Sequence, residues 1–189
     1  MAERRKARIA TTSLAGCFGC HMAFLDMDER LIDLMERVEI DRSPLTDIKR
    51  FTRRCDIGII EGGCCNEENV HVLQDFRRHC DVLIGIGQCA IMGGLPAMRN
   101  AIMHSDEPLR ECLEEAYITG RYLRNRTHQV PNDPALPLLL DEVYPCSQVV
   151  EMDYQIPGCA PEGDLIHDTL VQLLEGRFRG FERKRISFD

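Results

Sequence analysis

The sequence predicts an α/β fold with a mostly parallel sheet, because short apolar runs alternate along the chain with segments of helical spacing. Two of these runs, residues 56–60 and 81–86, are compact and closely followed by glycine, which is typical of strands buried on both faces. Between them, residues 67–79 carry acids in the first turn and Arg77, Arg78 and His79 in the last. This charge order complements a helix dipole and predicts a helix between the two strands.

The other elements are predicted from the same two signals. Strands are expected over residues 8–14, 38–40 and 149–156. Helices are expected over residues 22–37, 95–103, 109–123 and 165–174, from the spacing of their apolar side chains. Residues 125–145 hold four prolines and no regular pattern, so this irregular stretch is predicted to be a functional or partner-binding loop.

Length and charge limit the class of protein. A chain of 189 residues, 44% of them hydrophobic, is long enough for one domain with its own core; we assign residues 1–175 to that domain and 176–189 to a basic tail. The formal net charge of −8 disfavours a nucleic-acid partner, because phosphate binding needs a basic face. Basic residues crowd both ends, as Arg4, Arg5, Lys6 and Arg8 and as Arg177, Arg179, Arg183, Lys184 and Arg185. We interpret these ends as solvated, charged segments that dock on an acidic partner, in preference to the alternative of plain solvated tails.

The cysteine content has to be interpreted together with the cellular compartment. No run approaches the roughly 20 apolar residues that a membrane span requires, and Arg4-Arg5 is not followed by the apolar segment of an export signal. We therefore expect a cytoplasmic protein. Because cytosolic thiols stay reduced, a disulfide framework does not explain the 10 cysteines, and some of them are expected to bind metal.

Several cysteines follow predicted strands. Cys17 and Cys20 come after the first strand, Cys64 and Cys65 after residues 56–60, Cys89 after residues 81–86 and Cys159 after the last strand. The carboxyl ends of parallel strands meet at one edge of a sheet, where ligands bind, and nearby glycines let backbone N–H groups approach an anionic ligand. The cysteines in or beside elements are interpreted as small buried hydrophobic residues; they are Cys55, Cys80, Cys112 and Cys146.

Four thiolates can hold zinc or an iron–sulfur cluster. Structural zinc sites usually have two paired knuckles, whereas here one pair, Cys17 and Cys20, is completed by distant single cysteines, which favours a cluster. Residues 17–21 also match the C-x-x-C-H motif of c-type haem attachment, and a C-x-x-C after a strand is typical of thioredoxin-like sites. Both alternatives are disfavoured because they leave Cys89 and Cys159 without a role.

Four short segments occur in a specific joint order. They are Cys17-x-x-Cys20, Glu61-Gly62, Gly87-Gln88-Cys89-Ala90 with Gly93-Gly94, and Pro157-Gly158-Cys159. Together they resemble the small subunit of nickel–iron hydrogenases, in particular the short form of cytosolic NAD-reducing hydrogenases. The resemblance implies a flavodoxin-like domain with helices on both faces of the sheet. It also implies one proximal 4Fe-4S cluster, held here by Cys17, Cys20, Cys89 and Cys159.

The resemblance implies an electron-transfer subunit of a hydrogen:NAD oxidoreductase. The nickel–iron centre would lie in a separate large subunit, and electrons would leave through the cluster toward a diaphorase module that carries FMN and reduces NAD. One alternative is a complex-I-like subunit of a quinone oxidoreductase, because adjacent cysteines such as Cys64 and Cys65 occur in that related subunit, although in its first loop. A non-redox zinc-binding module is the other alternative.

Four further side chains near these motifs carry expectations. Glu61 ends a buried apolar run, so it is either a proton-path or subunit-interface residue or a carboxylate that accepts N–H bonds from its own loop. His21 is a candidate donor to a cluster sulfur. Cys64 and Cys65 are not expected to be obligatory ligands, because four thiolates already fill the site.

Overall fold

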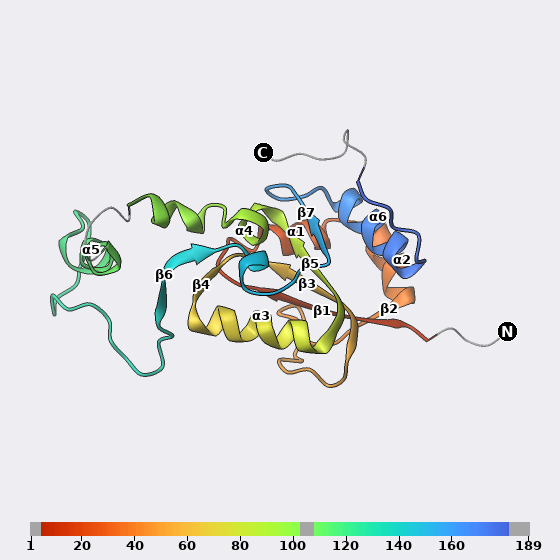
Figure 1. Ribbon diagram of the computed structural model, residues 1–189, viewed down its shortest axis with the longest axis horizontal. Coiled ribbons are helices and arrows are strands. Elements are labelled where there is room, and N and C mark those ends of the chain that lie inside the picture. The colour runs from red at the N-terminus through yellow and green to blue at the C-terminus, as the bar shows by residue number, and fades with distance from the viewer. Residues whose placement is uncertain (1–4, 103–107, 182–189) are drawn as a thin grey trace.

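The computed structural model describes residues 5–102 and 108–181. Its central feature is a five-stranded parallel sheet in the order β2-β1-β3-β5-β7 (Figure 1). The strands are β1 (Ala7–Ser13), β2 (Val38–Ile40), β3 (Cys55–Glu61), β5 (Cys80–Ile86) and β7 (Tyr154–Ile156). A sheet that grows outward from β1 in both directions has the flavodoxin-like order, so the predicted fold class is confirmed.

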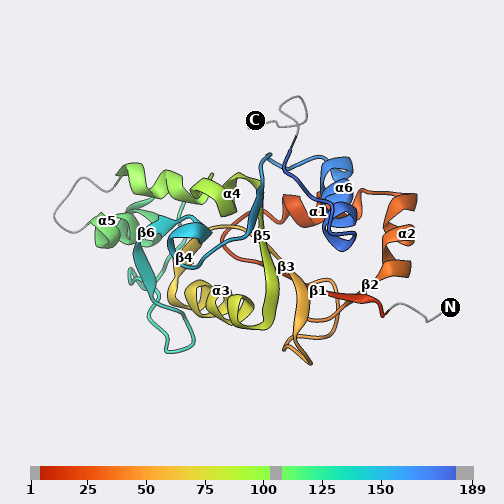
Figure 2. The same cartoon turned by 45° about the vertical axis from the view of Figure 1, so that its right-hand side comes forward.

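Helices cover both faces of the sheet (Figure 2). One face carries α1 (Gly19–Leu25), α2 (Glu29–Arg37) and α6 (Gly163–Leu174), and the other carries α3 (Glu67–His79). Successive strand residues point to opposite faces, so neighbours in β3 enter different cores: Ile59 packs with Phe24 and Ile166, whereas Ile60 packs with Phe76. Alternation within apolar strands thus builds two cores and holds the strand ends in fixed positions.

Local sequence explains the elements that were predicted most accurately. The helix over residues 67–79 has the predicted bounds, since Asn66 accepts the Asn69 N–H at 2.8 Å and begins α3, and its basic residues end it. Residues 38–40 form β2 as expected. α6 begins two residues before the predicted 165–174, and its buried side chains are Leu165, Ile166, Thr169 and Leu170.

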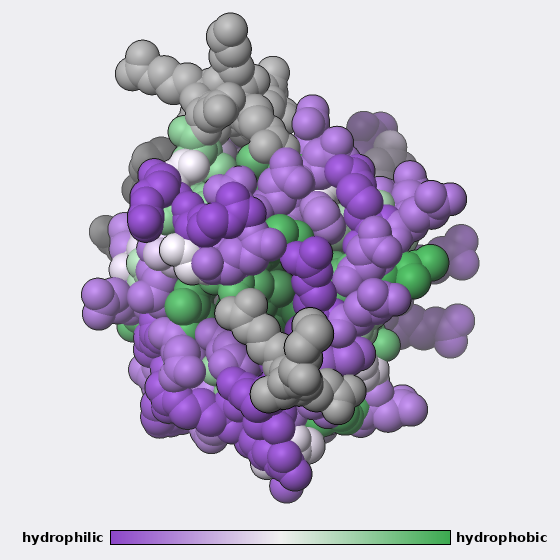
Figure 3. Space-filling view, turned by 90° about the vertical axis from the view of Figure 1, so that its right-hand side faces the viewer, coloured by the Kyte–Doolittle hydropathy of each residue, from purple (hydrophilic) through white to green (hydrophobic). Residues whose placement is uncertain are grey.

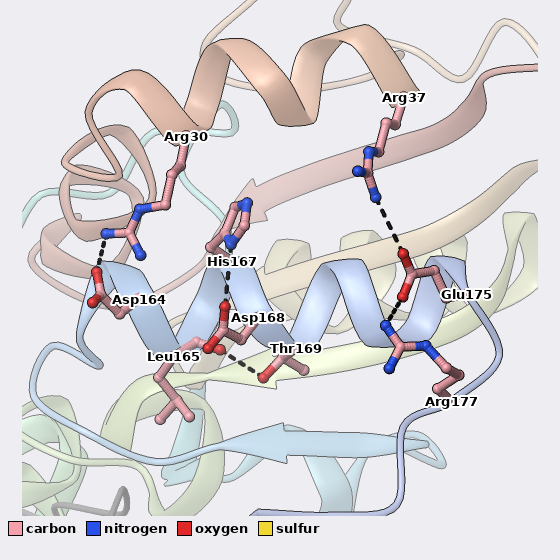
Figure 4. Close-up of polar contacts among 9 residues, drawn as sticks. All are labelled: Arg30, Arg37, Asp164, Leu165, His167, Asp168, Thr169, Glu175 and Arg177. Atoms are coloured by element: carbon pink, nitrogen blue, oxygen red, sulfur yellow. Dashed lines mark hydrogen bonds and ion pairs between the residues drawn. The ribbon is translucent and has the colours of Figure 1, made fainter.

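Surface ion pairs join α2 to α6 (Figure 4). Arg30 pairs with Asp164 and Arg37 with Glu175, which also pairs with Arg177. The end of the molecule that presents α2 and α6 is mostly hydrophilic, with small separate hydrophobic patches (Figure 3). Exposed pairs of this kind add little to stability, so the apolar core holds these helices to the sheet.

Two predicted elements are shorter or broken. Residues 22–37 form two helices, because the chain turns at Asp28, whose φ is +54°, and buries Met27 between them. Only the end of residues 149–156 is a strand. A short 3-10 helix, Cys146–Gln148, precedes it and Val150 donates its N–H to Cys146, which keeps residues 149–150 out of the sheet.

The region after Cys89 departs most from expectation. Residues 95–103 form a 3-10 helix over Pro96–Ile102 rather than an α-helix, and Met103 lies outside the described residues. Residues 109–123 are helical only through α5 (Pro108–Glu114) and one π turn (Glu115–Thr119), because Gly120 adopts an extended ψ of 135°. Within residues 125–145, β6 (Leu139–Tyr144) pairs antiparallel with β4 (Cys64–Asn66), so the expectation of a loop throughout is wrong.

These segments form an arm that projects beyond the sheet, at the left of Figures 1 and 2. We call residues 108–139 the arm. Within the part of the chain that the structure describes, no helix has the length and apolarity needed to cross a bilayer.

Candidate metal centre

Four cysteines approach one another at the carboxyl edge of the sheet. Cys17 lies in the loop after β1 and Cys20 in α1, Cys89 lies in α4 (Gly87–Met92) directly after β5, and Cys159 follows β7. Cys20 interacts electrostatically with each of the other three thiols. The structure therefore brings together, from three separate strand ends, the four cysteines that the family resemblance implies, whereas Cys64 and Cys65, which the sequence also placed after a strand, lie in β4.

The four thiols differ in solvent exposure. Cys20 is 8% exposed and Cys89 is half-buried, whereas Cys17 and Cys159 are exposed. Burial, together with the charges of Glu61 and the other thiols, raises the pKa of Cys20 to about 12, and burial also raises the pKa of Cys89. Without a cation these two thiols stay protonated at neutral pH. Metal binding would have to displace their protons, as is usual for thiolate ligands.

Glycines make room for two of these thiols. Gly87 has a φ of +79°, and a Cβ at this position would lie 2.3 Å from the Cys20 Sγ. Gly94 has a φ of +51°, and its Cβ would lie 2.7 Å from the Cys89 Sγ. A larger residue would meet both a strained backbone and a thiol, so the glycine content of these loops follows from the packing of the cysteines.

The arrangement of the thiols bears on the choice between zinc and a cluster. Among the residues that the structure describes, no three His, Cys, Asp or Glu side chains are grouped so that they could hold one metal ion. A zinc ion needs four ligands at about 2.0–2.3 Å, whereas each thiolate of a four-iron cluster binds a different iron atom. The four thiols supply the donor set of a four-iron cluster, one cysteine for each iron atom. The Gly19 N–H donates to the Cys17 Sγ at 3.4 Å, which supplies one of the expected backbone donors to sulfur.

A buried pair of polar side chains lies beside the thiols. Glu61 and His21 are 2% and 1% exposed, and the Glu61 Oε2 lies 2.5 Å from the His21 Nδ1. The same oxygen accepts the backbone N–H of His21 at 2.9 Å. Glu61 thus binds the first turn of α1 rather than N–H groups of its own loop, and it fixes the helix that carries Cys20.

Both ring nitrogens of His21 are engaged within the chain. Its Nε2 lies 2.9 Å from the Thr11 Oγ1, which in turn lies 2.7 Å from the Ser43 Oγ. The expectation that His21 donates to a cluster sulfur is therefore wrong, because Nδ1 and Nε2 are already bonded to Glu61 and Thr11. Sequence reasoning missed Thr11 and Ser43. In the sequence these two residues are distinguished only as polar residues next to apolar runs. That position does not predict which side chain they bond.

The other cysteines have partners away from the four converging thiols. The Cys64 and Cys146 side chains are fully buried against each other, and the Cys146 thiol donates to the Gly62 carbonyl at 3.2 Å. Cys55 and Cys80 are buried neighbours on β3 and β5. The Cys65 thiol lies 3.3 Å from the Asn69 Oδ1, and Cys112 is half-buried in α5. The buried hydrophobic role is thus confirmed for Cys55, Cys80 and Cys146.

Comparison with known proteins gives consistent matches along most of the chain. Residues 17–173 match the family model described as the NADH ubiquinone oxidoreductase 20 Kd subunit. The NAD-reducing hydrogenase HoxS subunit delta of Cupriavidus necator is 49% identical over 91% of this chain and 80% of its own length. A subunit of the vhu hydrogenase of Methanococcus voltae is 35% identical over 91% of this chain, and the match spans only 58% of that longer protein.

A solved structure gives the same result in three dimensions. A chain in the crystal structure of an NAD+-reducing nickel–iron hydrogenase in the H2-reduced state superposes with a TM-score of 0.90 at 49% identity. The match covers 98% of this chain and 100% of that one. A chain of a nickel–iron–selenium hydrogenase of Dm. baculatum superposes with a TM-score of 0.59 at 13% identity, which shows a common fold only.

Proposed function

The chain belongs to the family of the NADH ubiquinone oxidoreductase 20 Kd subunit, and from this premise we propose that it is the electron-transfer small subunit of an NAD-reducing nickel–iron hydrogenase. The observation that carries the proposal is the likeness along nearly the whole chain to the delta subunit of such an enzyme. The convergence of four thiols at one edge of the sheet supports the electron-transfer role.

We assign one 4Fe-4S cluster to Cys17, Cys20, Cys89 and Cys159. When bound, it would supply reversible one-electron transfer, at a potential that charge, hydrogen bonds to sulfur and exposure adjust. The chain itself contributes the hydrogen bond from the Gly19 N–H to the Cys17 sulfur. It also places the Glu61 carboxylate against the backbone N–H of His21, the residue that follows Cys20 in α1. In the proposed role Glu61 holds α1 through His21 and keeps Cys20 in position.

The proposed complex needs partners on more than one side. We assign the nickel–iron site to a large subunit, and FMN and NAD to a diaphorase module, in a cytoplasmic enzyme. Large apolar side chains are exposed near two of the proposed ligands: Met22 near Cys20, and Met92, Leu95 and Met98 after Cys89, each between 50% and 71% exposed. Water is a poor environment for such a group of side chains, which supports a partner subunit at this edge.

Metal analysis of the anaerobically purified complex tests the proposal. We expect at least about four irons with labile sulfide per copy of this chain, nickel together with further iron in a co-purified partner, and hydrogen-dependent reduction of NAD. Zinc without iron would contradict the electron-transfer role. Iron and sulfide with no nickel in any partner would instead favour the complex-I-like alternative.

A further inference from the structure

The far end of the arm carries an isolated basic surface. Residues 116–132 contain three arginines, Arg121, Arg124 and Arg126, and no acidic residue, in a chain whose net charge is −8. All three arginines are exposed. We call them the basic tip.

The basic tip differs from the arginines on the body of the molecule. There, arginines are typically paired, as Arg5 is with Asp56 and Arg77 is with Asp153, at 2.7 and 2.6 Å. Within the described residues none of the three tip arginines forms an ion pair, and Arg121 lies over the ring of Tyr122, which is 89% exposed. Cationic groups without internal partners next to an exposed aromatic ring are typical of a binding surface.

A local turn keeps the tip in shape. The Asn125 side chain donates from Nδ2 to the carbonyls of Tyr117 and Gln129, at 2.7 and 2.8 Å, and its Oδ1 accepts the N–H and the hydroxyl of Thr127. Asn125 is therefore directed into the turn while its neighbours on either side stay exposed. The arginines are presented from an ordered turn instead of an unstructured segment, which lowers the entropy cost of binding.

The same arm has an apolar groove beside the tip. Leu109, Leu113, Tyr117, Pro131, Leu136 and Leu138 line a groove of about 610 Å³. A partner that meets both the tip and the groove would combine acidic residues with an apolar contact. This combination disfavours nucleic acid, which offers phosphates without an aliphatic segment.

The base of the arm is fixed to the segment that carries Cys89. Arg99 donates to the Leu140 carbonyl at 2.9 Å, and Asn100 exchanges two hydrogen bonds with Val143 at 2.9 and 2.8 Å. The exposed Leu95 and Met98 lie between Cys89 and this junction in the chain. A partner that covers Cys89 and these two exposed side chains would therefore lie next to the base of the arm.

We propose that the arm docks on the nickel–iron subunit, with the basic tip against an acidic surface and the groove around an apolar segment of that subunit. The proposal rests on the proposed function, because it takes the nickel–iron subunit to be the partner at the cysteine edge. Charges at the rim of an interface act mainly on association rate and salt dependence. Complex formation should therefore weaken as ionic strength rises.

Charge reversal in the complete complex tests the proposal. All subunits are co-expressed with an affinity tag on this chain, and the retained nickel-bearing subunit is measured by nickel content across a series of NaCl concentrations. The variant is Arg124→Glu with Arg126→Glu. The matched control is Arg50→Glu with Arg53→Glu, a pair of exposed arginines in the loop between β2 and β3 that form no ion pair within the described residues and change the charge equally.

We expect the tip variant to bind the nickel-bearing subunit at least about tenfold more weakly at low salt, and with less salt dependence, than the wild type or the control. Arg124→Lys with Arg126→Lys should restore retention, and the labile sulfide per copy of this chain should be the same in every variant as in the wild type, which shows an intact fold. Equal retention of tip variant and wild type would overturn the proposal, as would equal losses in the tip variant and the control.

Two further outcomes separate the proposal from its alternatives. If the wild-type complex binds a 20-base-pair DNA duplex, or vesicles of phosphatidylserine, and only the tip variant loses that binding while keeping its nickel, the surface serves another class of partner and the proposal is wrong. If no nickel-bearing protein is retained even by the wild type, both the docking proposal and the proposed function fail.

Discussion

The cysteine edge and the arm are connected through the segment after Cys89, yet they are stabilised differently. At the edge, polar side chains have partners inside the protein: Glu61 binds His21, and His21 binds Thr11. In the arm, Leu136, Leu138 and Tyr122 are between 51% and 89% exposed, and the tip arginines have no ion-pair partner among the described residues. The edge is built by the chain itself, whereas the arm has the composition of a surface that a partner completes.

The difference yields predictions that separate changes to the edge from changes elsewhere. Substitutions at the edge should disturb the chain by itself, since they leave buried groups without partners or strain a packed loop. Substitutions at exposed positions should leave the chain folded.

The largest effect is expected from the proposed ligands. Replacing Cys17, Cys20, Cys89 or Cys159 by Ser should abolish the cluster, because each leaves one iron atom without its thiolate. The matched control is Cys112→Ser in α5 of the arm, which should cost stability only. Electron paramagnetic resonance of the reduced proteins and their iron content measure the effect. An unchanged signal in Cys89→Ser would show that the ligand assignment is wrong.

Breaking the buried pair is expected to have the next largest effect. Glu61→Ala leaves His21 buried without its partner and should lower the free energy of unfolding by about 3 kcal/mol. Glu39→Ala is the control, because its pair with Arg8 spans 3.6 Å and the Glu39 side chain is 64% exposed, so that the loss should stay below about 1 kcal/mol. Denaturant unfolding of both variants provides the measurement. Equal losses would mean that the pair does not hold α1.

Sequence reasoning succeeded where the determining signal was local or periodic. Apolar runs and helix-end charges predicted the sheet and α3, and the position of cysteines after strands predicted the edge at which four of them meet. It failed where contacts join distant positions. Thr11 bonds Ser43, and β4 pairs with β6, only because the folded chain brings these distant positions together. The local sequence of each partner contains no pattern that predicts the other.

Helix ends show the same limit on a smaller scale. The apolar period of residues 22–37 continues through the break at Asp28, because α1 and α2 both bury apolar residues against the same face of the sheet. Periodicity reports which residues are buried, and it does not report a change of direction between two helices that share a core.

Substitutions at two glycines, Gly87 and Gly176, separate the effect of backbone strain from the effect of a steric clash with a packed thiol. Gly87→Ala would place a Cβ 2.3 Å from the Cys20 Sγ at a φ of +79°, so we expect a loss of about 2 kcal/mol or more and reduced iron content. Gly176 has a φ of +66°, and no atom lies within 4 Å of the Cβ that an alanine would add. Gly176→Ala should therefore lower the free energy of unfolding by about 1 kcal/mol without loss of iron. Thermal unfolding and iron analysis test both. Normal iron content in Gly87→Ala would show that Cys20 does not need this space.

The smallest effect is expected from replacing the carboxylate of Asp56 on β3, for which Asp141 on β6 is the comparison. Partial burial alone would raise the pKa of Asp56, but hydrogen bonds from the Arg8 N–H and the Arg5 guanidinium outweigh it and lower that pKa. A depressed folded-state pKa stabilises the protein above the unfolded value, about 3.9, and this contribution is lost as the pH falls through the lower folded value.

Asp56→Asn should therefore lower stability at pH 7 by less than about 1 kcal/mol, with a smaller difference from wild type once the pH falls below about 3.9. A hydrogen bond from the Tyr144 hydroxyl likewise lowers the pKa of Asp141, but this side chain is exposed on β6, so Asp141→Asn should change unfolding at neither pH. Urea unfolding at pH 7 and pH 3 gives both values. If Asp141→Asn proved as costly as Asp56→Asn, the segment that closes the arm would contribute to the stability of the chain as the sheet does, and it would not be a surface that depends on a partner.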